Sequence, residues 1–241
     1  MPDRYGPRGV VAILIPVQNS NMQPEYEAMR PAGISNQIYR FWLEGEGDTP
    51  LEAAIRVIPD ALKCWPDRII VGNSVEMRRV SVAEHHAYRA RLQEAAGDVL
   101  VVTAAEACEA ALRTLGARSI GLFNPMFEHN SQSAASYYQE LGFDPRRLGW
   151  LDVDKPEKII DVTPEQITGA FAEIAGEDVD ALLHVGGALG VVGMLDELEA
   201  ELGKPIVSVN AATYWYTLRS LGVSDPLPGF GRLLMQTAAT A

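Results

Sequence analysis

Short apolar runs alternate with longer segments of helical periodicity along the whole chain. Helical patterns separate most of the runs, and the runs have the length and composition of buried strands: 9–16, 37–43, 68–72, 99–103, 119–123, 148–153, 181–185 and 205–209. Because strands that alternate with helices pair in parallel through crossover connections, this pattern predicts an α/β fold with parallel sheets.

The segment 182–210 shows this pattern most completely. A buried strand ends at Gly186 and Gly187, a helical pattern follows over 192–202 and stops at Gly203, and a second short strand leads to Asn210. A strand, a turn, a helix and a second strand form a right-handed crossover, whose ligand site lies beyond the carboxyl end of the strand. Bare backbone N–H groups there suit an anion such as a carboxylate.

Polar or glycine residues follow four of the predicted strands, at Asn19, at Asn73 and Ser74, at Gly186 and Gly187, and at Asn210. Strand ends of this kind converge on one crevice in an α/β fold, so together they predict a binding site. The alternative is that each asparagine only caps the helix that follows it.

Composition and charge narrow the class of protein. The 241 residues are 47% hydrophobic and 22% charged, as in an ordinary globular protein, and the net charge is −12. This charge argues against nucleic acid and anionic membranes as partners. No apolar run is long enough to span a bilayer, and the start of the chain is polar, unlike a signal peptide. With only two cysteines, we expect a cytoplasmic protein without disulfides, metal or cofactor.

Three segments carry a resemblance to a known family. Residues 16–25, PVQNSNMQPE, are similar to the P-x-x-N-x-x-M-x-P-E signature of maleate cis-trans isomerases and arylmalonate decarboxylases, within the aspartate/glutamate racemase superfamily. Residues 197–221 and the GFGRLL at 229–234 also resemble this family. The resemblance implies two pseudo-symmetric, Rossmann-like α/β lobes with the active site in the cleft between them. We expect the first lobe to comprise 1–110 plus 212–241, and the second 111–211.

The resemblance also implies where catalytic groups belong. The family places one catalytic cysteine at a strand end of each lobe, and those positions fall here at Asn73 and Val185; a family tyrosine falls at Met126. The chain's own cysteines, Cys64 and Cys108, lie inside helical patterns away from strand ends. We therefore expect chemistry that does not depend on a thiol.

Donors for a bound carboxylate and a source of protons remain to be assigned. We expect oxygen-binding N–H groups and side chains at Asn19, Ser74, Val75, Gly186, Gly187 and Asn210, with Val185 and Met126 forming an apolar wall. Candidates for the proton donor are Glu76, Tyr39, Glu128 and His129. His184 precedes the site position by one residue, so strand alternation turns it toward the helix layer, and His85 and His86 lack acidic partners at metal-binding spacing.

Together these features favour a cysteine-independent isomerase or decarboxylase, a lyase, acting on a small carboxylic acid. Two alternatives stay open: a hydrolytic or retro-aldol enzyme that uses the same cleft, and a non-catalytic carboxylate-binding protein. We expect the small carboxylic acid to be the main partner, and the chain to form a homo-oligomer.

Overall fold

The computed structural model describes residues 4–239 and contains two four-stranded parallel sheets. The first has the order β2-β1-β3-β4 and the second the order β6-β5-β7-β8, so the two sheets repeat one topology. The strands are β1 (Gly9–Pro16), β2 (Ile34–Phe41), β3 (Arg68–Val71), β4 (Leu100–Thr103), β5 (Ser119–Asn124), β6 (Asp144–Trp150), β7 (Ala181–His184) and β8 (Ile206–Ser208). The predicted α/β fold with two lobes is confirmed.

Helices follow most strands and cover the sheets. They are α1 (Met22–Ala28), α2 (Pro50–Ala61), α3 (Val82–Ala96), α4 (Ala104–Thr114), α5 (Glu128–Glu140), α6 (Pro164–Ile174), α7 (Leu195–Leu202), α8 (Val209–Ser220) and α9 (Gly231–Leu234), with 3₁₀ turns η1 (Leu62–Cys64), η2 (Val75–Arg78), η3 (Pro156–Asp161) and η4 (Val192–Met194). Thr49 and Thr163 cap α2 and α6 through their side-chain oxygens, with proline in the first turn of each, as the sequence predicts.

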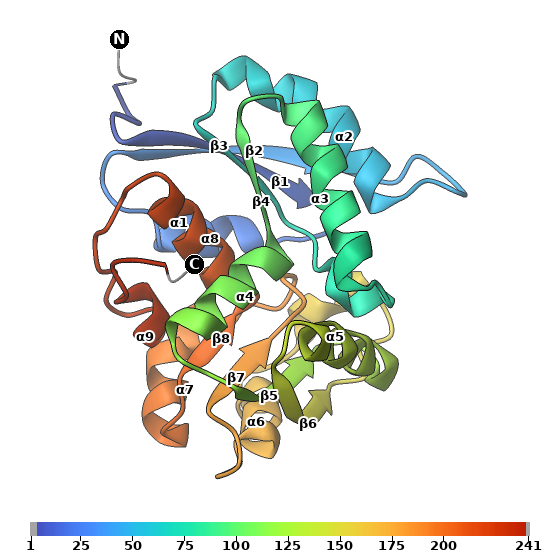
Figure 1. Cartoon of the computed structure of the whole chain (residues 1–241), viewed down its shortest axis with the longest axis vertical. Helices are drawn as coiled ribbons and strands as arrows, with labels where there is room; N and C mark the ends of the chain where they lie inside the picture. Colours follow the sequence, from blue (N-terminus) through green and yellow to red (C-terminus); the bar gives the residue numbers. More distant parts are fainter. Residues whose placement is uncertain (1–3, 240–241) are drawn as a thin grey trace.

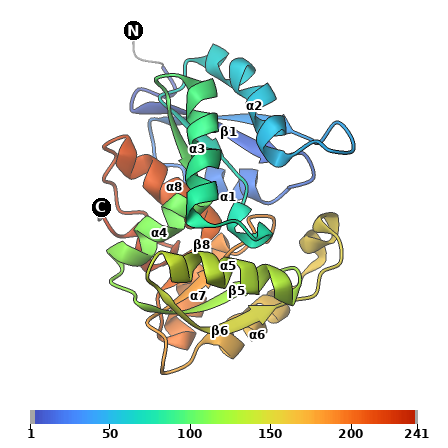
Figure 2. The same cartoon turned by 45° about the vertical axis from the view of Figure 1, so that its right-hand side comes forward.

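The two sheets lie in separate lobes, and α4 and α8 lie between them (Figures 1 and 2). Helix α4 continues directly from β4 and packs along α8, which also contacts β3, β4 and β8. Helix α4 buries mainly alanines, and α8 buries alanines together with Tyr214 and Trp215, both fully buried. No helix among residues 4–239 is both long enough and apolar enough to cross a bilayer.

Two local features of this fold concern the site. The strand expected at 37–43 runs from Ile34 to Phe41, as an edge strand paired only with β1. The polar segment 17–25, which follows the first predicted strand, already contains the first turn of α1. Asn19 lies two residues before the N-cap residue Asn21, and its Oδ1 accepts the N–H groups of Asn21 and Met22 at 3.1 and 3.0 Å, which stabilises the start of this helix.

Candidate functional site

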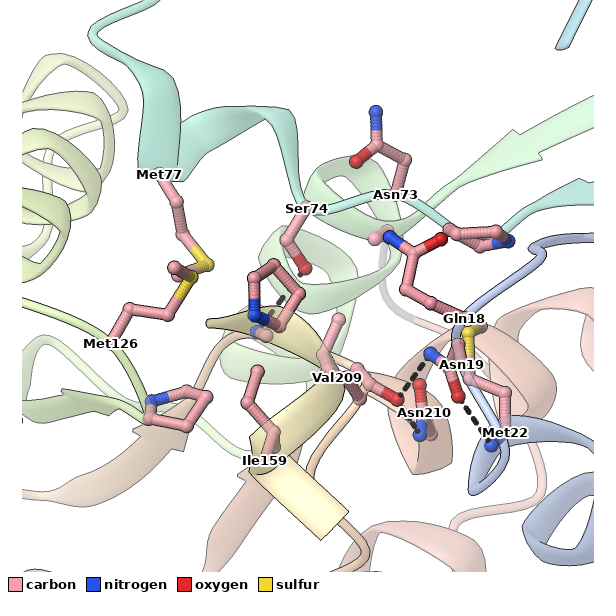
Figure 3. A pocket seen from close by; sticks show the side chains of 18 of the residues that line it. Gln18, Asn19, Met22, Asn73, Ser74, Met77, Met126, Ile159, Val209 and Asn210 are labelled. Carbon is pink, nitrogen blue, oxygen red and sulfur yellow. Dashed lines mark hydrogen bonds between the residues drawn. The ribbon is translucent and has the colours of Figure 1, made fainter. Parts of the chain in front are cut away.

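A cavity of about 300 Å³ lies where the carboxyl ends of strands from both sheets approach each other (Figure 3). A volume of this size is at the lower end for small-molecule sites. The lining comes from the ends of β1, β3, β5 and β7 and from α1, α4, α5, η2, η3 and α8: Pro16, Gln18, Asn19, Met22, Gly72, Asn73, Ser74, Met77, Arg78, Ala104, Pro125, Met126, Asn130, Pro156, Ile159, Gly186, Gly187, Ala188, Val209, Asn210 and Thr213.

The Gly186–Gly187 turn after β7 needs both glycines. Gly186 has a φ of +101°, and a Cβ there would lie 2.8 Å from Cδ of Pro125. A Cβ on Gly187 would lie 2.5 Å from Oδ1 of Asn210. With no side chain at either position, the backbone of this turn forms the pocket wall.

The turn meets the first lobe across the pocket at Ser74. The Gly186 N–H donates to Oγ of Ser74 at 3.3 Å, so the hydroxyl hydrogen of Ser74 remains available to a ligand. The N–H groups of Ser74 and Gly187 make no hydrogen bond within residues 4–239. Unpaired backbone donors from two loops therefore border one cavity, an arrangement that suits a carboxylate.

Three asparagine side chains, two of them from the first lobe, hold this turn in place. Asn19 donates from Nδ2 to the carbonyl of Gly187 at 3.0 Å, and Asn21 donates to the carbonyl of Ala188 at 2.7 Å. Asn210 also donates to the Gly187 carbonyl, at 3.0 Å. Because Oδ1 of Asn19 is already occupied by two backbone N–H groups, its amide contributes mainly to positioning the turn and retains one free N–H.

Glu25 completes the connection between the lobes. Its Oε1 accepts the N–H groups of Val191 and Val192 at 2.6 and 2.7 Å, and its Oε2 accepts Nδ2 of Asn210 at 2.6 Å. Burial raises the pKa of Glu25, while these hydrogen bonds favour its charged form. We call the set Asn19, Asn21, Glu25 and Asn210, with the 187–192 segment that they bind, the interlobe clasp.

The opposite wall, η2 and the loop before it, has a different character. Asn73 and Ser74 leave this loop in opposite directions, and the Nδ2 of Asn73 is buried with no hydrogen-bond partner among the described residues (Figure 3). Glu76 is fully buried, and both of its carboxyl oxygens also lack partners within residues 4–239. Burial raises the pKa of Glu76 to about 7, although the charge of Arg78 opposes this shift.

Glu76 itself lies outside the pocket lining. Its charge raises the pKa values of Cys108, Tyr137 and Tyr138, which also lie outside the lining, so its carboxyl group faces away from the cavity. As a proposed proton donor it would have to act through a change in η2, since a buried turn separates it from the cavity.

Three further residues predicted for the site lie outside the pocket lining. Val185 is fully buried in the core, because β7 ends at His184 and the chain turns at Gly186, which brings backbone rather than the Val185 side chain to the cavity. Val75 is likewise buried and absent from the lining. Tyr39 on β2 lies beside Cys64, and burial is the main cause that raises its pKa to about 12.

The remaining predicted residues share this one cavity: Asn19, Asn73, Ser74, Met126, Gly186, Gly187 and Asn210. Sequence reasoning did not select several other lining residues, among them Gly72, Met77, Arg78 and Ile159. Gly72 could have been predicted from the sequence, because it directly follows the apolar residues of β3 and so lies at a strand end. Ile159 carries none, since η3 comes from a long connection after β6 that approaches the cavity only in three dimensions.

The lining contains one charged side chain, Arg78, and no cysteine, histidine, aspartate, glutamate or tyrosine. Cys64 lies in η1, where its Sγ donates to the carbonyl of Ala61 at 3.2 Å. Cys108 is fully buried in α4, and burial raises the pKa of its thiol well above the ordinary value.

The histidines considered from the sequence also lie away from the cavity lining. His184 packs against Phe123 and Phe171, its Nδ1 lies 3.3 Å from Oγ of Ser208, and burial lowers its pKa to about 3. His85 lies between Thr103 and Tyr137, at 3.1 and 2.9 Å, in a site that lowers its pKa to about 4. Within residues 4–239, no three histidine, cysteine or acidic side chains gather as metal ligands would.

Comparison with known proteins gives one consistent result. The model of the arylmalonate decarboxylase family matches residues 69–234. A maleate isomerase of Nocardia farcinica is 24% identical over 95% of this chain and 96% of its own length. An arylmalonate decarboxylase of Bordetella bronchiseptica is 28% identical over 68% of this chain and 69% of its own length.

Solved structures share the fold. The maleate cis-trans isomerase of Nocardia farcinica, in a mutant form with a covalently bound succinylcysteine intermediate, superposes with a TM-score of 0.85 at 24% identity, covering 94% of this chain and 98% of that one. An arylmalonate decarboxylase structure gives a TM-score of 0.80 at 20% identity, covering 94% of this chain and 99% of that one. The family match covers more than half of the sequence, and this chain belongs to the arylmalonate decarboxylase family.

Proposed function

We propose that this protein is an enzyme that acts on a small carboxylic acid in the pocket between its lobes, by an isomerase or lyase reaction that uses no thiol. The observation that carries the proposal is the pocket lining itself. It offers backbone and hydroxyl donors at Ser74 and Gly187 but contains no cysteine.

Two parts of the lining contact different parts of the substrate. The donors of Ser74 and Gly187 hold the oxygens of one carboxylate. Met77, Met126 and Ile159 present apolar surface on the η2 and η3 side of the same cavity (Figure 3). A carboxylate pressed against that surface is poorly solvated, which disfavours its charge and favours its loss as neutral CO₂.

Of the two reaction types, decarboxylation asks less of this lining. The bond between the substrate carbon and the leaving carboxylate breaks, and its electron pair passes into the retained carboxylate, which becomes an enediolate. The donors of Ser74 and Gly187 stabilise the negative charge on its oxygens. A covalent isomerisation, as the succinylcysteine relative illustrates, needs a nucleophile that this lining lacks. We therefore favour the lyase.

One proton must still reach the carbon. No carboxyl, imidazole, thiol or phenol lines the cavity, so we assign this proton to water that enters through the pocket mouth. Glu76, with a pKa of about 7, has a suitable acidity for a general acid, but its buried position makes it the second choice. Protonation by water predicts product without a fixed handedness.

A non-catalytic carboxylate-binding protein is the second candidate, and the lack of a titratable acid or base in the lining favours it. A hydrolytic or retro-aldol enzyme has no comparable support, because both reactions need such a group.

Turnover separates the two candidates. The purified protein would be incubated with phenylmalonic, methylmalonic and maleic acids in D₂O, with proton NMR following substrate loss and deuterium uptake. We expect CO₂ release from a malonic acid, and a tenfold or greater rate loss in Ser74→Ala, because removing one such donor costs roughly that much or more. Binding of these acids without turnover would leave the carboxylate-binding protein, and no binding would refute both.

A further inference from the structure

A surface groove that carries two arginines lies beside the pocket. The groove is lined by Met77, Arg78, Arg79, His129 and Asn130, and it shares Met77, Arg78 and Asn130 with the pocket. The two hollows therefore adjoin each other at η2. We call Arg78 and Arg79 the cationic mouth; both are exposed.

The two arginines of the mouth make no side-chain hydrogen bond or ion pair within residues 4–239, whereas most other arginines form such contacts. Three arginines, Arg78, Arg79 and Arg118, make no side-chain hydrogen bond, ion pair or ring contact within residues 4–239. The others bind carboxylates, carbonyls, hydroxyls or an aromatic ring. In a protein with 32 acidic and 20 basic residues, two adjacent guanidinium groups without partners leave charge free for an anion.

The backbone that presents these side chains is fixed. Asn130 donates to the carbonyl of Met77 at 3.0 Å and accepts the N–H of Phe127 at 3.2 Å, which ties η2 to the start of α5. The ring of His129 stacks on Phe127 with centroids 5.6 Å apart. The mouth is thus held on both sides by the same contacts that shape the pocket.

Nearby carboxylates already have other partners. Glu128 accepts a hydrogen bond from Gln132, and Glu140 accepts the N–H of Val82. Glu84 caps α3 through Ser81. Glu76 differs from these three, because it is fully buried without a hydrogen-bond partner within residues 4–239; burial raises its pKa and the charge of Arg78 opposes this shift, but the two side chains form no ion pair. No acidic side chain lines the groove itself.

From this juxtaposition of pocket and mouth we infer that the substrate carries a further anionic group, besides the retained and the leaving carboxylate of the proposed reaction, several bonds away from the carboxylate held at Ser74 and Gly187, and that Arg78 binds it with help from Arg79. The inference rests on the proposed function, since it needs the first carboxylate in the pocket. It assigns Arg78 as the residue that selects extended dianionic acids over singly charged acids of the same length. Guanidinium forks bind carboxylate and phosphoryl oxygens in pairs, so both are suitable groups.

The test compares ligands matched in length. Calorimetry at low ionic strength would measure Kd for hexanoate, adipate and 5-phosphonopentanoate with the wild type, Arg78→Gln and Arg118→Gln. Arg118 is the matched control, because it is exposed and unpaired but lies at the opposite end of β5, away from the pocket.

We expect adipate or the phosphonate to bind the wild type at least tenfold more tightly than hexanoate, as a charge-assisted hydrogen bond allows. Arg78→Gln should bring that ratio close to one, and Arg118→Gln should keep it. Equal wild-type affinities for the mono- and dianions, or equal losses in the two variants, would overturn the inference alone. Failure of every acid to bind would remove the proposed function, and the inference with it.

Discussion

The two walls of the pocket differ in how completely their buried polar atoms are paired. In the interlobe clasp, Glu25 accepts three hydrogen bonds and Asn19 makes three, all between 2.6 and 3.1 Å. On the opposite wall, Nδ2 of Asn73 and both oxygens of Glu76 are buried without partners among the described residues. Both walls begin in the same way, with an asparagine just after a strand.

This difference in pairing indicates that the clasp is structural and that the η2 wall contacts the ligand. A fully paired wall gains stability and holds the Gly186–Gly187 turn in one geometry. A wall with unpaired buried groups costs stability, and such a cost is typical of functional sites. We therefore assign the side chains of the clasp to positioning the turn whose Gly187 N–H binds the ligand, and the η2 wall to the remaining ligand contacts.

Breaking the clasp at its centre should have the largest effect. Glu25→Ala leaves the N–H groups of Val191 and Val192 and the amide of Asn210 without their acceptor. At roughly 1–3 kcal/mol for each unpaired buried donor, we expect the free energy of unfolding to fall by about 4 kcal/mol. Urea denaturation would measure this, with Glu27→Ala on the exposed side of α1 as the control. A loss below about 1 kcal/mol would show that the clasp contributes little.

A substitution at Glu76 in the η2 wall should raise the free energy of unfolding at high pH, whereas Glu25→Ala should lower it. The folded-state pKa of Glu76 is about 7, above its ordinary value of 4.5, so the folded protein binds more protons between these pH values than the unfolded chain does. The contribution of Glu76 to stability is therefore present below pH 4.5 and is lost as pH rises through 7.

Glu76→Gln should remove this loss. At pH 8.5 the variant should be more stable than the wild type by up to about 3 kcal/mol, from 1.36 kcal/mol per unit of pKa. Near pH 4.5 the two should be similar. Unfolding free energies measured across this pH range would check it, and a wild-type stability that rises from pH 5 to 8 relative to Glu76→Gln would contradict it.

The smallest predicted difference compares the two asparagines directly. Asn19→Ala removes three hydrogen bonds and should cost about 2 kcal/mol, whereas Asn73→Ala removes an amide with an unpaired Nδ2 and should cost less than about 0.5 kcal/mol. Thermal or urea unfolding of the pair would check this order. Equal losses of unfolding free energy in the two variants would contradict the proposed difference between the walls.

Much of this architecture follows from sequence alone. Apolar runs and helix caps such as Thr163 predict the alternation of strands and helices, because burial and capping act over a few neighbouring residues. The polar strand ends predict which loops meet. The role of Asn19 did not follow, since a polar residue that binds ligand and one that binds backbone look identical in sequence. The sequence predicts Val185 for the cavity wall, but in the fold β7 ends at His184 and the chain turns at Gly186, so the Val185 side chain is buried in the core.

The contribution of Arg78 also required the structure. A lone arginine in a polar stretch is ordinarily solvated or paired on the surface. Only the folded chain shows that it borders the cavity and lacks a carboxylate partner within residues 4–239.

The central claim is that this member of the family acts on a carboxylic acid without a thiol. The most direct test measures turnover of the best acid from the malonic and maleic series by the wild type and by the double variant Cys64→Ala, Cys108→Ala, each before and after iodoacetamide. We predict that kcat/KM of the double variant stays within about threefold of the wild type and that alkylation changes neither. Loss of activity on alkylating the wild type, at a rate that bound substrate slows, would contradict the claim.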